Sequence, residues 1–454
     1  MENEIVKLPN RSQPRAMLPI DIARSNGNRY SGNLYGYYVE NTNFYNILPP
    51  DAHIDNAKVS VIGHIYDIDI ENYLSPEIKG QIHFLTITAD KDLTPVERLR
   101  LNKMKRERTL ADTSRFIDEI CKIPDVSRRY SYANDATGNE RVFIEAPFSD
   151  EIVGYWKEEK LHLLQVSSLV EIQIETYALK LDVFSRNTGI LESSIMLGKG
   201  ALFIGCGSVG SLVAVELAKA GVGRFMLVDN DIFGYHNICR HQCGIYDVGR
   251  YKTDALADRI LQINPYAEVI KKNCVIQDVD RDEIYNFCNE DAIVIGGADN
   301  REGDLYANKF AIKQKSPFMS IGCWERAFAG EIFYCLPEGM PTYEDFMAAV
   351  GGVSGRVTQN RRFYTSEVEL EKVSFEPGIS ADINFVTIIA VKMAIDLLNR
   401  NNPDYTQRVL PYLTQYTLVC NTNNPKIGGE DAEIFTYPLQ VTTSIKVPYA
   451  NKQK

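Results

Sequence analysis

A glycine-rich loop is the first segment of the chain whose residues could carry chemistry. Gly205, Gly207 and Gly210 form a G-x-G-x-x-G pattern. The pattern follows the apolar run Ala201-Leu-Phe-Ile and precedes a helical pattern at 209–220. Its glycines permit a tight turn, a close approach of nucleotide to backbone, and close packing of helix on strand. The N-terminus of the helix favours a negative group, so the loop predicts a nucleotide site.

A carboxylate stands where a ribose would need one. Asp229 ends the apolar run Phe225-Met-Leu-Val, 24 residues after Gly205. An acidic residue at this place can bind ribose hydroxyls. The glycine loop and Asp229 together predict an adenine nucleotide, and NAD fits them as well as ATP does.

Two cations favour a phosphate-handling enzyme. Arg240 and Lys252 follow the glycine loop, after Asp231 and Asn237. Arginine offers a planar fork to phosphate and lysine a point charge. Adenylyl transfer needs such cations to offset the charge that develops on the transferring and leaving oxygens. Each residue alone could be a surface charge, but together they favour ATP over NAD.

The series of motifs resembles the ThiF/MoeB/HesA family, which shares its adenylation fold with the ubiquitin-activating enzymes. The likeness covers about residues 185–400 and depends on the order of the motifs, since each is weak alone. The motifs are Gly205-x-Gly-x-x-Gly, Asp229-x-Asp231, Asn237-x-x-Arg240, Gly249-x-x-Lys252, Ile263-Asn-Pro265 and Asp299-Asn300.

The resemblance implies a role for each motif. Arg240 and Lys252 would hold the phosphates of ATP, and Asp299 would hold Mg²⁺. Family members commonly form homodimers in which an arginine just before the first core strand reaches the neighbouring site, and Arg186 is the candidate here. The nucleotide-binding positions would be Gly205, Gly207, Gly210, Asp229, Asp231, Asn237, Arg240 and Lys252.

The chain departs from the family pattern at two places. The family usually has Arg-Gln where this sequence has Arg240-His241. Many members carry Cys-x-x-Cys after a Pro-x-x-x-Pro segment, and here Pro337-Glu-Gly-Met-Pro341 is followed by neither cysteine. We therefore expect no structural zinc.

A thiol that captures the acyl adenylate is harder to place. The segment 337–378, before a helix at about 380–398, often holds it in the family, and here it has no cysteine. Cys335, at the end of a strand, is the best candidate because it has the best chance of exposure, and Cys323 is the second. No cation close in sequence activates Cys335, so we expect no obligatory thioester on this chain.

Alternating strand and helix patterns after residue 200 must position these residues. They predict an α/β fold with a doubly wound, mostly parallel, Rossmann-like sheet, which binds ligands at the carboxyl ends of its strands. The elements are Ala201-Leu-Phe-Ile, 209–220, Phe225-Met-Leu-Val, about 250–263, Ala292-Ile-Val-Ile, 301–315 and Phe318-Met-Ser-Ile.

The first part of the chain carries no motif that we can tie to chemistry. We expect a smaller α+β domain at 1–183, with a role in partner recognition, and the adenylation domain at 184–454. Its expected elements are an irregular arm at 1–50, β-like runs within 58–90, a helix at 94–122, a loop from Asn134, and a helix at about 158–182.

Composition excludes several classes of protein. The 454 residues are 44% apolar and 24% charged, which is typical of a globular enzyme. The net charge of −11 argues against nucleic-acid binding. The N-terminus lacks the layout of a signal peptide, and no apolar run is long enough to span a bilayer. We expect a cytoplasmic protein.

These patterns favour one function and leave others open. We expect the chain to adenylate the C-terminal carboxylate of a ubiquitin-like protein, for transfer to a conjugating enzyme or another acceptor. A ribosomal peptide is the alternative substrate. The remaining hypotheses are a non-catalytic scaffold with a ThiF-like fold, which the retained cations disfavour, and a nicotinamide oxidoreductase.

Overall fold

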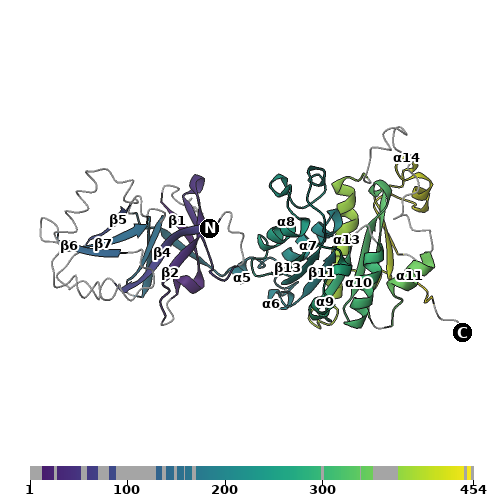
Figure 1. Cartoon of the computed structure of the whole chain (residues 1–454), viewed down its shortest axis with the longest axis horizontal. Helices are drawn as coiled ribbons and strands as arrows, with labels where there is room; N and C mark the ends of the chain where they lie inside the picture. The colour runs from purple at the N-terminus through teal and green to yellow at the C-terminus, as the bar shows by residue number, and fades with distance from the viewer. Residues whose placement is uncertain are drawn as a thin grey trace, which may run out of the picture. The chain divides into compact units, whose positions relative to one another are not determined.

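The chain forms two compact units, Met1–Asp182 and Val183–Lys454 (Figure 1). Among the residues that the structure describes, no helix has the length and apolar character to cross a membrane. The computed structural model describes residues 13–24, 28–52, 59–69, 81–87, 129–134, 140–147, 151–157, 159–165, 170–297, 301–337, 339–350, 377–443 and 447–450.

The first unit is built on β-sheets. A seven-stranded sheet has the order β10-β1-β3-β2-β4-β8-β9, and a three-stranded sheet has the order β5-β7-β6. Two short helices are α1 (Ile20–Ala23) and α5 (Leu179–Asp182). The strands are β1 (Arg15–Pro19), β2 (Gly32–Val39), β3 (Phe44–Leu48), β4 (Ser60–Asp69), β5 (Gln81–Ile87), β6 (Arg129–Asn134), β7 (Glu140–Pro147), β8 (Ile152–Lys157), β9 (Lys160–Gln165) and β10 (Gln173–Tyr177).

Two expectations for this unit were wrong. Residues 1–50 hold three strands instead of an irregular arm, and 158–182 holds β9 and β10 instead of a helix. The reason is visible in β9, where Leu161 and Leu163 are buried and His162 between them is half-buried. This alternation has the period of a strand, and β9 pairs antiparallel with β8. The expected helix at 94–122 lies outside the described residues.

The second unit is built on one eight-stranded sheet, with the order β13-β12-β11-β14-β15-β16-β17-β18. The pairs from β13 to β15 are parallel, and those from β15 to β18 are antiparallel. The expectation of a doubly wound, mostly parallel sheet is confirmed. The strands are β11 (Gly200–Ile204), β12 (Arg224–Val228), β13 (Glu268–Lys272), β14 (Ala292–Gly296), β15 (Phe318–Cys323), β16 (Ala329–Cys335), β17 (Tyr416–Cys420) and β18 (Gln440–Thr443).

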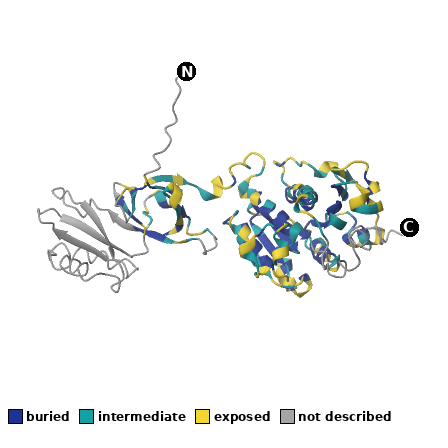
Figure 2. Cartoon of the chain, turned by 90° about the horizontal axis from the view of Figure 1, so that it is seen from above, coloured by how far each residue is buried: buried dark blue, intermediate teal, exposed yellow. Residues whose placement is uncertain are grey.

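Helices cover both faces of this sheet. Successive side chains of a strand point to opposite faces, so a strand whose residues are all buried needs a packed layer on each face. In β11, Ala201 and Phe203 pack into a core with α7, α8 and α13, whereas Leu202 and Ile204 pack into a core with α9, α10 and α11. The strands appear as the buried layer in Figure 2. The helices are α6 (Ser193–Met196), α7 (Ser208–Lys219), α8 (Lys252–Leu261), α9 (Arg281–Phe287), α10 (Arg301–Lys313), α11 (Tyr343–Val350), α13 (Ser380–Leu398) and α14 (Pro425–Gly428).

The strand order reverses between β11 and β14, and this reversal positions the site. From β11 the chain adds β12 and β13 on one side, then returns to place β14 and β15 on the other. A crevice forms at the carboxyl ends of the strands at such a point, and ligands bind there. The glycine loop, which joins β11 to α7, starts at this crevice.

The third glycine of the loop is expected to matter for stability more than the second. A Cβ on Gly210 would lie 2.1 Å from the carbonyl oxygen of Gly205, whereas a Cβ on Gly207 would meet nothing within 4 Å. We expect G210A to lower the free energy of unfolding by about 1–3 kcal/mol, since the clash is with backbone. The matched control G207A should stay within about 1 kcal/mol of wild type. Urea unfolding measures both, and equal stabilities would contradict this account.

Candidate nucleotide-binding site

An open pocket of about 260 Å³ lies at the carboxyl ends of the parallel strands of the second unit. It is formed by the ends of β11 and β12, the segments that follow β13 and β14, and the starts of α8 and α10. Its lining residues are Ile204, Gly205, Gly207, Val228, Asp229, Asn230, Asp231, Lys252, Cys274, Val275, Ile276, Gln277, Gly297 and Gly303.

The glycine loop turns sharply at one wall of this pocket. Gly205 has a φ of +93°, a left-handed conformation that favours glycine. After it the chain enters α7, whose 12 residues give the helix a dipole directed at the pocket. Gly207 precedes the first residue of α7 and lines the pocket. The loop is therefore shaped to place backbone N–H groups and a helix N-terminus against an anion.

Asp229 joins the glycine loop to the segment that follows β12. One carboxylate oxygen, Oδ2, accepts a hydrogen bond from the N–H of Cys206 at 2.7 Å. The other, Oδ1, accepts one from the N–H of Asp231 at 2.8 Å. A carboxylate has about four acceptor positions, so two remain for the hydroxyls of a ribose.

Backbone hydrogen bonds bring Lys252 back to Asp231. The N–H of Lys252 donates to the carbonyl of Asp231 at 3.0 Å, and that of Phe233 donates to the carbonyl of Arg250 at 2.8 Å. Gly249, with a φ of +91°, makes the turn just before this closure. The Lys252 Nζ then lies 2.6 Å from Asp231 Oδ2. An ammonium has three donors, so Lys252 can keep this partner and still bind a phosphate.

The closed loop 232–251 has both exposed and buried positions. Tyr235 and Tyr246 are 72% and 97% exposed, and Ile245 is 62% exposed. In contrast, Phe233, His241 and Cys243 are buried. The loop thus presents large side chains to solvent while its middle is packed.

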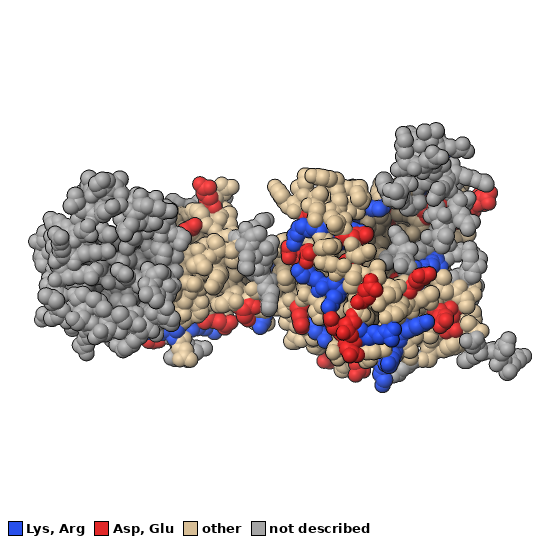
Figure 3. All heavy atoms as spheres, in the orientation of Figure 1, with Lys and Arg blue, Asp and Glu red and all other residues tan. Residues whose placement is uncertain are grey.

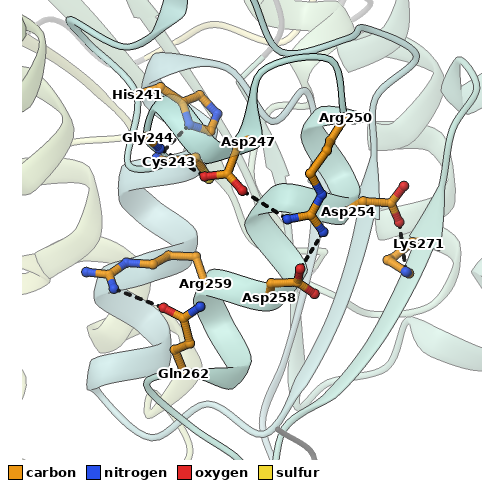
Figure 4. A network of polar contacts seen from close by, with 10 residues as sticks. All are labelled: His241, Cys243, Gly244, Asp247, Arg250, Asp254, Asp258, Arg259, Gln262 and Lys271. Carbon is orange, nitrogen blue, oxygen red and sulfur yellow. Dashed lines mark hydrogen bonds and ion pairs between the residues drawn. The ribbon is translucent and has the colours of Figure 1, made fainter. Parts of the chain in front are cut away.

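Arg250 fastens this loop to α8 (Figure 4). Its guanidinium pairs with Asp247 Oδ1 at 2.9 Å and also with Asp258 of α8. Asp247 in turn accepts the N–H of Gly244 at 2.9 Å. The segment 244–250 is therefore held on the helix that begins with Lys252.

His241, which stands where the family usually has glutamine, is buried beside the glycine loop. Its Nε2 lies 2.7 Å from the carbonyl oxygen of Cys206, and its Nδ1 accepts the N–H of Cys243 at 3.0 Å. The edge of the ring meets Phe233 at a centroid distance of 4.9 Å. Burial, reinforced by the charge of Lys252, lowers the pKa of His241 to about 4, so the ring is neutral near pH 7.

The structure does not gather all of the predicted site residues in the pocket. Gly205, Gly207, Asp229, Asp231 and Lys252 line it. Arg240 is half-buried and follows the 3₁₀ turn 235–237, where Asn237 Oδ1 accepts the N–H of Gly234 at 2.8 Å. Neither Arg240 nor Asn237 is a lining residue. Arg186 is exposed, between α5 and α6.

The predicted metal ligand cannot be placed in the same way. Asp299 lies outside the described residues, between Gly297 of the pocket lining and the start of α10 at Arg301. Over the residues that are described, no cluster of three or more His, Cys, Asp or Glu could hold a metal ion.

Cys335, which by its position had the best chance of exposure among the candidate thiols, is buried. Cys335 ends β16 inside the sheet and is 2% exposed, because α10 and α11 cover that face. Asn308 Nδ2 lies 3.2 Å from its sulfur. Burial raises the pKa of the thiol to about 12, so Cys335 is a neutral core residue. Cys323 is half-buried, whereas Cys239 is exposed.

Sequence reasoning missed the wall of the pocket opposite the glycine loop. Cys274, Val275, Ile276 and Gln277 follow β13, which no pattern predicted. The signal was weak because β13 is an edge strand that reads Glu268-Val-Ile-Lys-Lys, with charges on both faces. The order of a doubly wound sheet could have indicated it, since a strand normally follows α8.

Comparison with known proteins places the second unit in a family. A model of the ThiF family matches residues 197–427, just over half of the 454 residues. The chain is 30% identical over 126 residues to the sulfur carrier protein ThiS adenylyltransferase of Bacillus subtilis, covering 27% of this chain and 37% of that protein. It is 27% identical over 147 residues to ubiquitin-like modifier-activating enzyme 5 of Caenorhabditis elegans, covering 31% and 35%.

One more curated relative and one solved structure are also similar to the chain. The ATP-dependent ubiquitin transferase-like protein Cap2 of Pseudomonas aeruginosa is 29% identical over 124 residues, covering 24% of this chain and 23% of that protein. The matches therefore span well under half the length of each of these curated relatives. Among solved structures, E. coli MccB with SeMet MccA aligns with a TM-score of 0.41 and 17% identity, covering 58% of this chain and 67% of that chain. The match to the family model includes the glycine loop, Asp229 and Lys252, and the chain belongs to the ThiF family.

Proposed function

We propose that the chain uses ATP to adenylate the C-terminal carboxylate of a ubiquitin-like protein. A carboxylate oxygen of the partner attacks the α-phosphorus, the bond to the bridging oxygen breaks, and pyrophosphate leaves. The acyl adenylate then passes to a conjugating enzyme or another acceptor. The observation that carries this proposal is that the glycine loop, Asp229, Asp231 and Lys252 line one pocket in a chain of the ThiF family.

The pocket supplies charge where this reaction needs it. Lys252 and the N-terminus of α7 stand beside the same cavity, so both can stabilise the negative charge that moves from the carboxylate to pyrophosphate. On the face of the second unit seen in Figure 3, acidic and basic side chains are interspersed. The described part of this face therefore presents no broad positive field.

Two groups are proposed from the resemblance alone. Arg240 would add a second cation to the phosphates. Asp299 would hold Mg²⁺, which would neutralise part of the phosphate charge when bound.

The substrate class is proposed from the names of relatives. One is named for a sulfur carrier protein, and another for a ubiquitin-like modifier. Those names support a small protein with a free C-terminus, and a ribosomal peptide is the alternative.

We assign recognition of the partner to the first unit. Deleting residues 1–182 should then abolish binding of the partner while ATP binding persists.

The reaction is tested by ATP–pyrophosphate exchange with candidate ubiquitin-like proteins and peptides. K252A and R240A should each lower the rate by roughly 10²-fold, the scale for loss of one charge partner in a transition state. K219A is the matched control, since Lys219 is exposed at the end of α7, where its ammonium pairs with Glu216 three residues earlier. Full activity in both K252A and R240A would show that these cations are misassigned. Tight NAD binding without exchange would favour an oxidoreductase.

We also propose a homodimer in which Arg186 reaches the partner subunit's nucleotide. R186A and K252A should each be inactive alone. A mixture should recover about a quarter of wild-type activity, because half of the randomly formed dimers have one site with both residues intact. Light scattering establishes the dimer first. A fully active monomer, or a mixture that stays inactive, would exclude an arginine contributed in trans.

Onward transfer is expected to need no thioester at Cys335. Brief alkylation of the native protein, mapped by mass spectrometry, should modify exposed Cys239 before buried Cys335, because a thiol reacts only when accessible and deprotonated. Alkylation in urea is the control, and should modify both. C335A should keep its exchange activity. An ATP-dependent, thiol-sensitive adduct with the partner that disappears in C335A would contradict this expectation.

A further inference from the structure

The two successive peptide groups that flank Cys206 in the glycine loop are each held by a side chain from another segment. The N–H of Cys206 donates to Asp229 Oδ2 at 2.7 Å. The carbonyl oxygen of the same residue lies 2.7 Å from His241 Nε2. Cys206 itself is fully buried, and its contact with His241 is buried as well, whereas Asp229 is half-buried at the pocket. The backbone of the loop is thus fixed by two residues, of which only Asp229 belongs to a motif.

The contacts of His241 select one form of its ring. Nδ1 faces the N–H of Cys243 at 3.0 Å, as Figure 4 shows, and must therefore be an acceptor. Nε2 faces a carbonyl oxygen and must carry the proton. Only the neutral ring with hydrogen on Nε2 satisfies both partners. The imidazolium would place a second N–H against that of Cys243.

Fixing the carbonyl of Cys206 also fixes the N–H of Gly207. The two groups belong to one planar trans peptide, so they point in opposite directions. Gly207 lines the pocket, whereas His241 does not. A carbonyl held toward His241 therefore leaves the N–H of Gly207 on the side away from it, where an anion at the start of α7 would lie.

We propose that neutral His241 is a positioning residue that holds the Cys206–Gly207 peptide with its N–H directed at a phosphate of the nucleotide. This inference rests on the proposed use of ATP, and it adds to the nucleotide site a residue that contacts the loop but not the ligand.

The same geometry explains how histidine can replace the glutamine usual in the family. A glutamine amide also offers one donor and one acceptor at the end of a flat group. It could donate to the carbonyl of Cys206 and accept from the N–H of Cys243. A glutamine side chain does not become charged between about pH 4 and 8. H241Q therefore keeps the hydrogen bonds and removes the titration, so it separates the effect of hydrogen bonding from that of charge.

The groups around His241 determine how its contribution to stability changes with pH. Burial is the largest effect and disfavours a charged ring, as does Lys252 of α8. The hydrogen bond to the carbonyl of Cys206 and the charge of Asp247, in the 3₁₀ turn 245–247, favour a charged ring but are outweighed. The remaining neighbours are the backbone of Cys206 and Cys243 and the ring of Phe233. The pKa is about 4 in the folded chain and about 6.5 when unfolded. A lowered pKa means that this contribution to stability is complete above pH 6.5 and is lost as the pH falls towards 4.

The test is calorimetry of Mg-ATP binding to wild type, H241A and H241Q. At pH 7.5, H241A should bind roughly 10-fold more weakly, the scale for loss of a buried hydrogen bond that leaves its acceptor unpaired. H241Q should stay within about threefold of wild type, since it keeps both bonds. Between pH 6.5 and 4.5, the midpoint of thermal unfolding should fall further for wild type than for H241Q.

Hydrogen exchange without nucleotide tells a local effect from a general one. In H241A the amides of 205–211 should exchange faster, while those of α13 stay protected. Faster exchange throughout would mean that His241 serves only the fold and would overturn the proposal, as would equal ATP affinity in all three proteins or H241Q as weak as H241A. If H241A does not fold, H241Q that binds ATP much more weakly than wild type would still overturn the proposal. Wild-type protein that binds no ATP would instead remove the proposed function.

Discussion

The rest of the site depends on the two hydrogen bonds that the carboxylate of Asp229 accepts. This carboxylate binds one N–H of the glycine loop and one N–H of the segment after β12, so it joins the two strand ends that flank the pocket. Hydrogen bonds to a charged acceptor contribute about 1.5–3 kcal/mol each. Through Asp231 the same connection reaches Lys252. Lys252, which lies 21 residues after Asp231, is in this way linked to the glycine loop.

The site is assembled from short connections more than from one rigid element. The glycine loop meets Asp229 on one side and His241 on the other. The segment with His241 is fastened to α8 by Arg250, and α8 begins with Lys252. The links of Cys206 to Asp229 and to His241 join residues 23 and 35 positions apart, so the pocket depends on the parallel sheet to bring the strand ends together. This order of dependence fits a fold whose long-range strand pairs define the ligand crevice.

Much of the second unit could be predicted from sequence because its strands are buried on both faces. β11, β12, β14 and β15 are continuous apolar runs, and the helices between them follow the expected ranges. β13 could not be recognised, since a charged edge strand has the composition of a loop. The burial of Cys335 could not be decided from sequence, because the position at a strand end does not reveal which helices cover it. In the first unit, the β-like runs expected within 58–90 correspond to β4 and β5, whereas β1 and β3 have five residues each and are too short to show a clear alternation.

Different positions of the loop 232–251 are under different constraints on their sequence. Backbone bonds and the buried side chains of Phe233 and His241 hold the loop. Tyr235, Ile245 and Tyr246 are exposed and are not among the residues that line the pocket. Substitutions at these exposed positions cost little in folding, so they are free to drift or to be selected for contacts of their own, while the buried positions of the same loop stay under strict constraint.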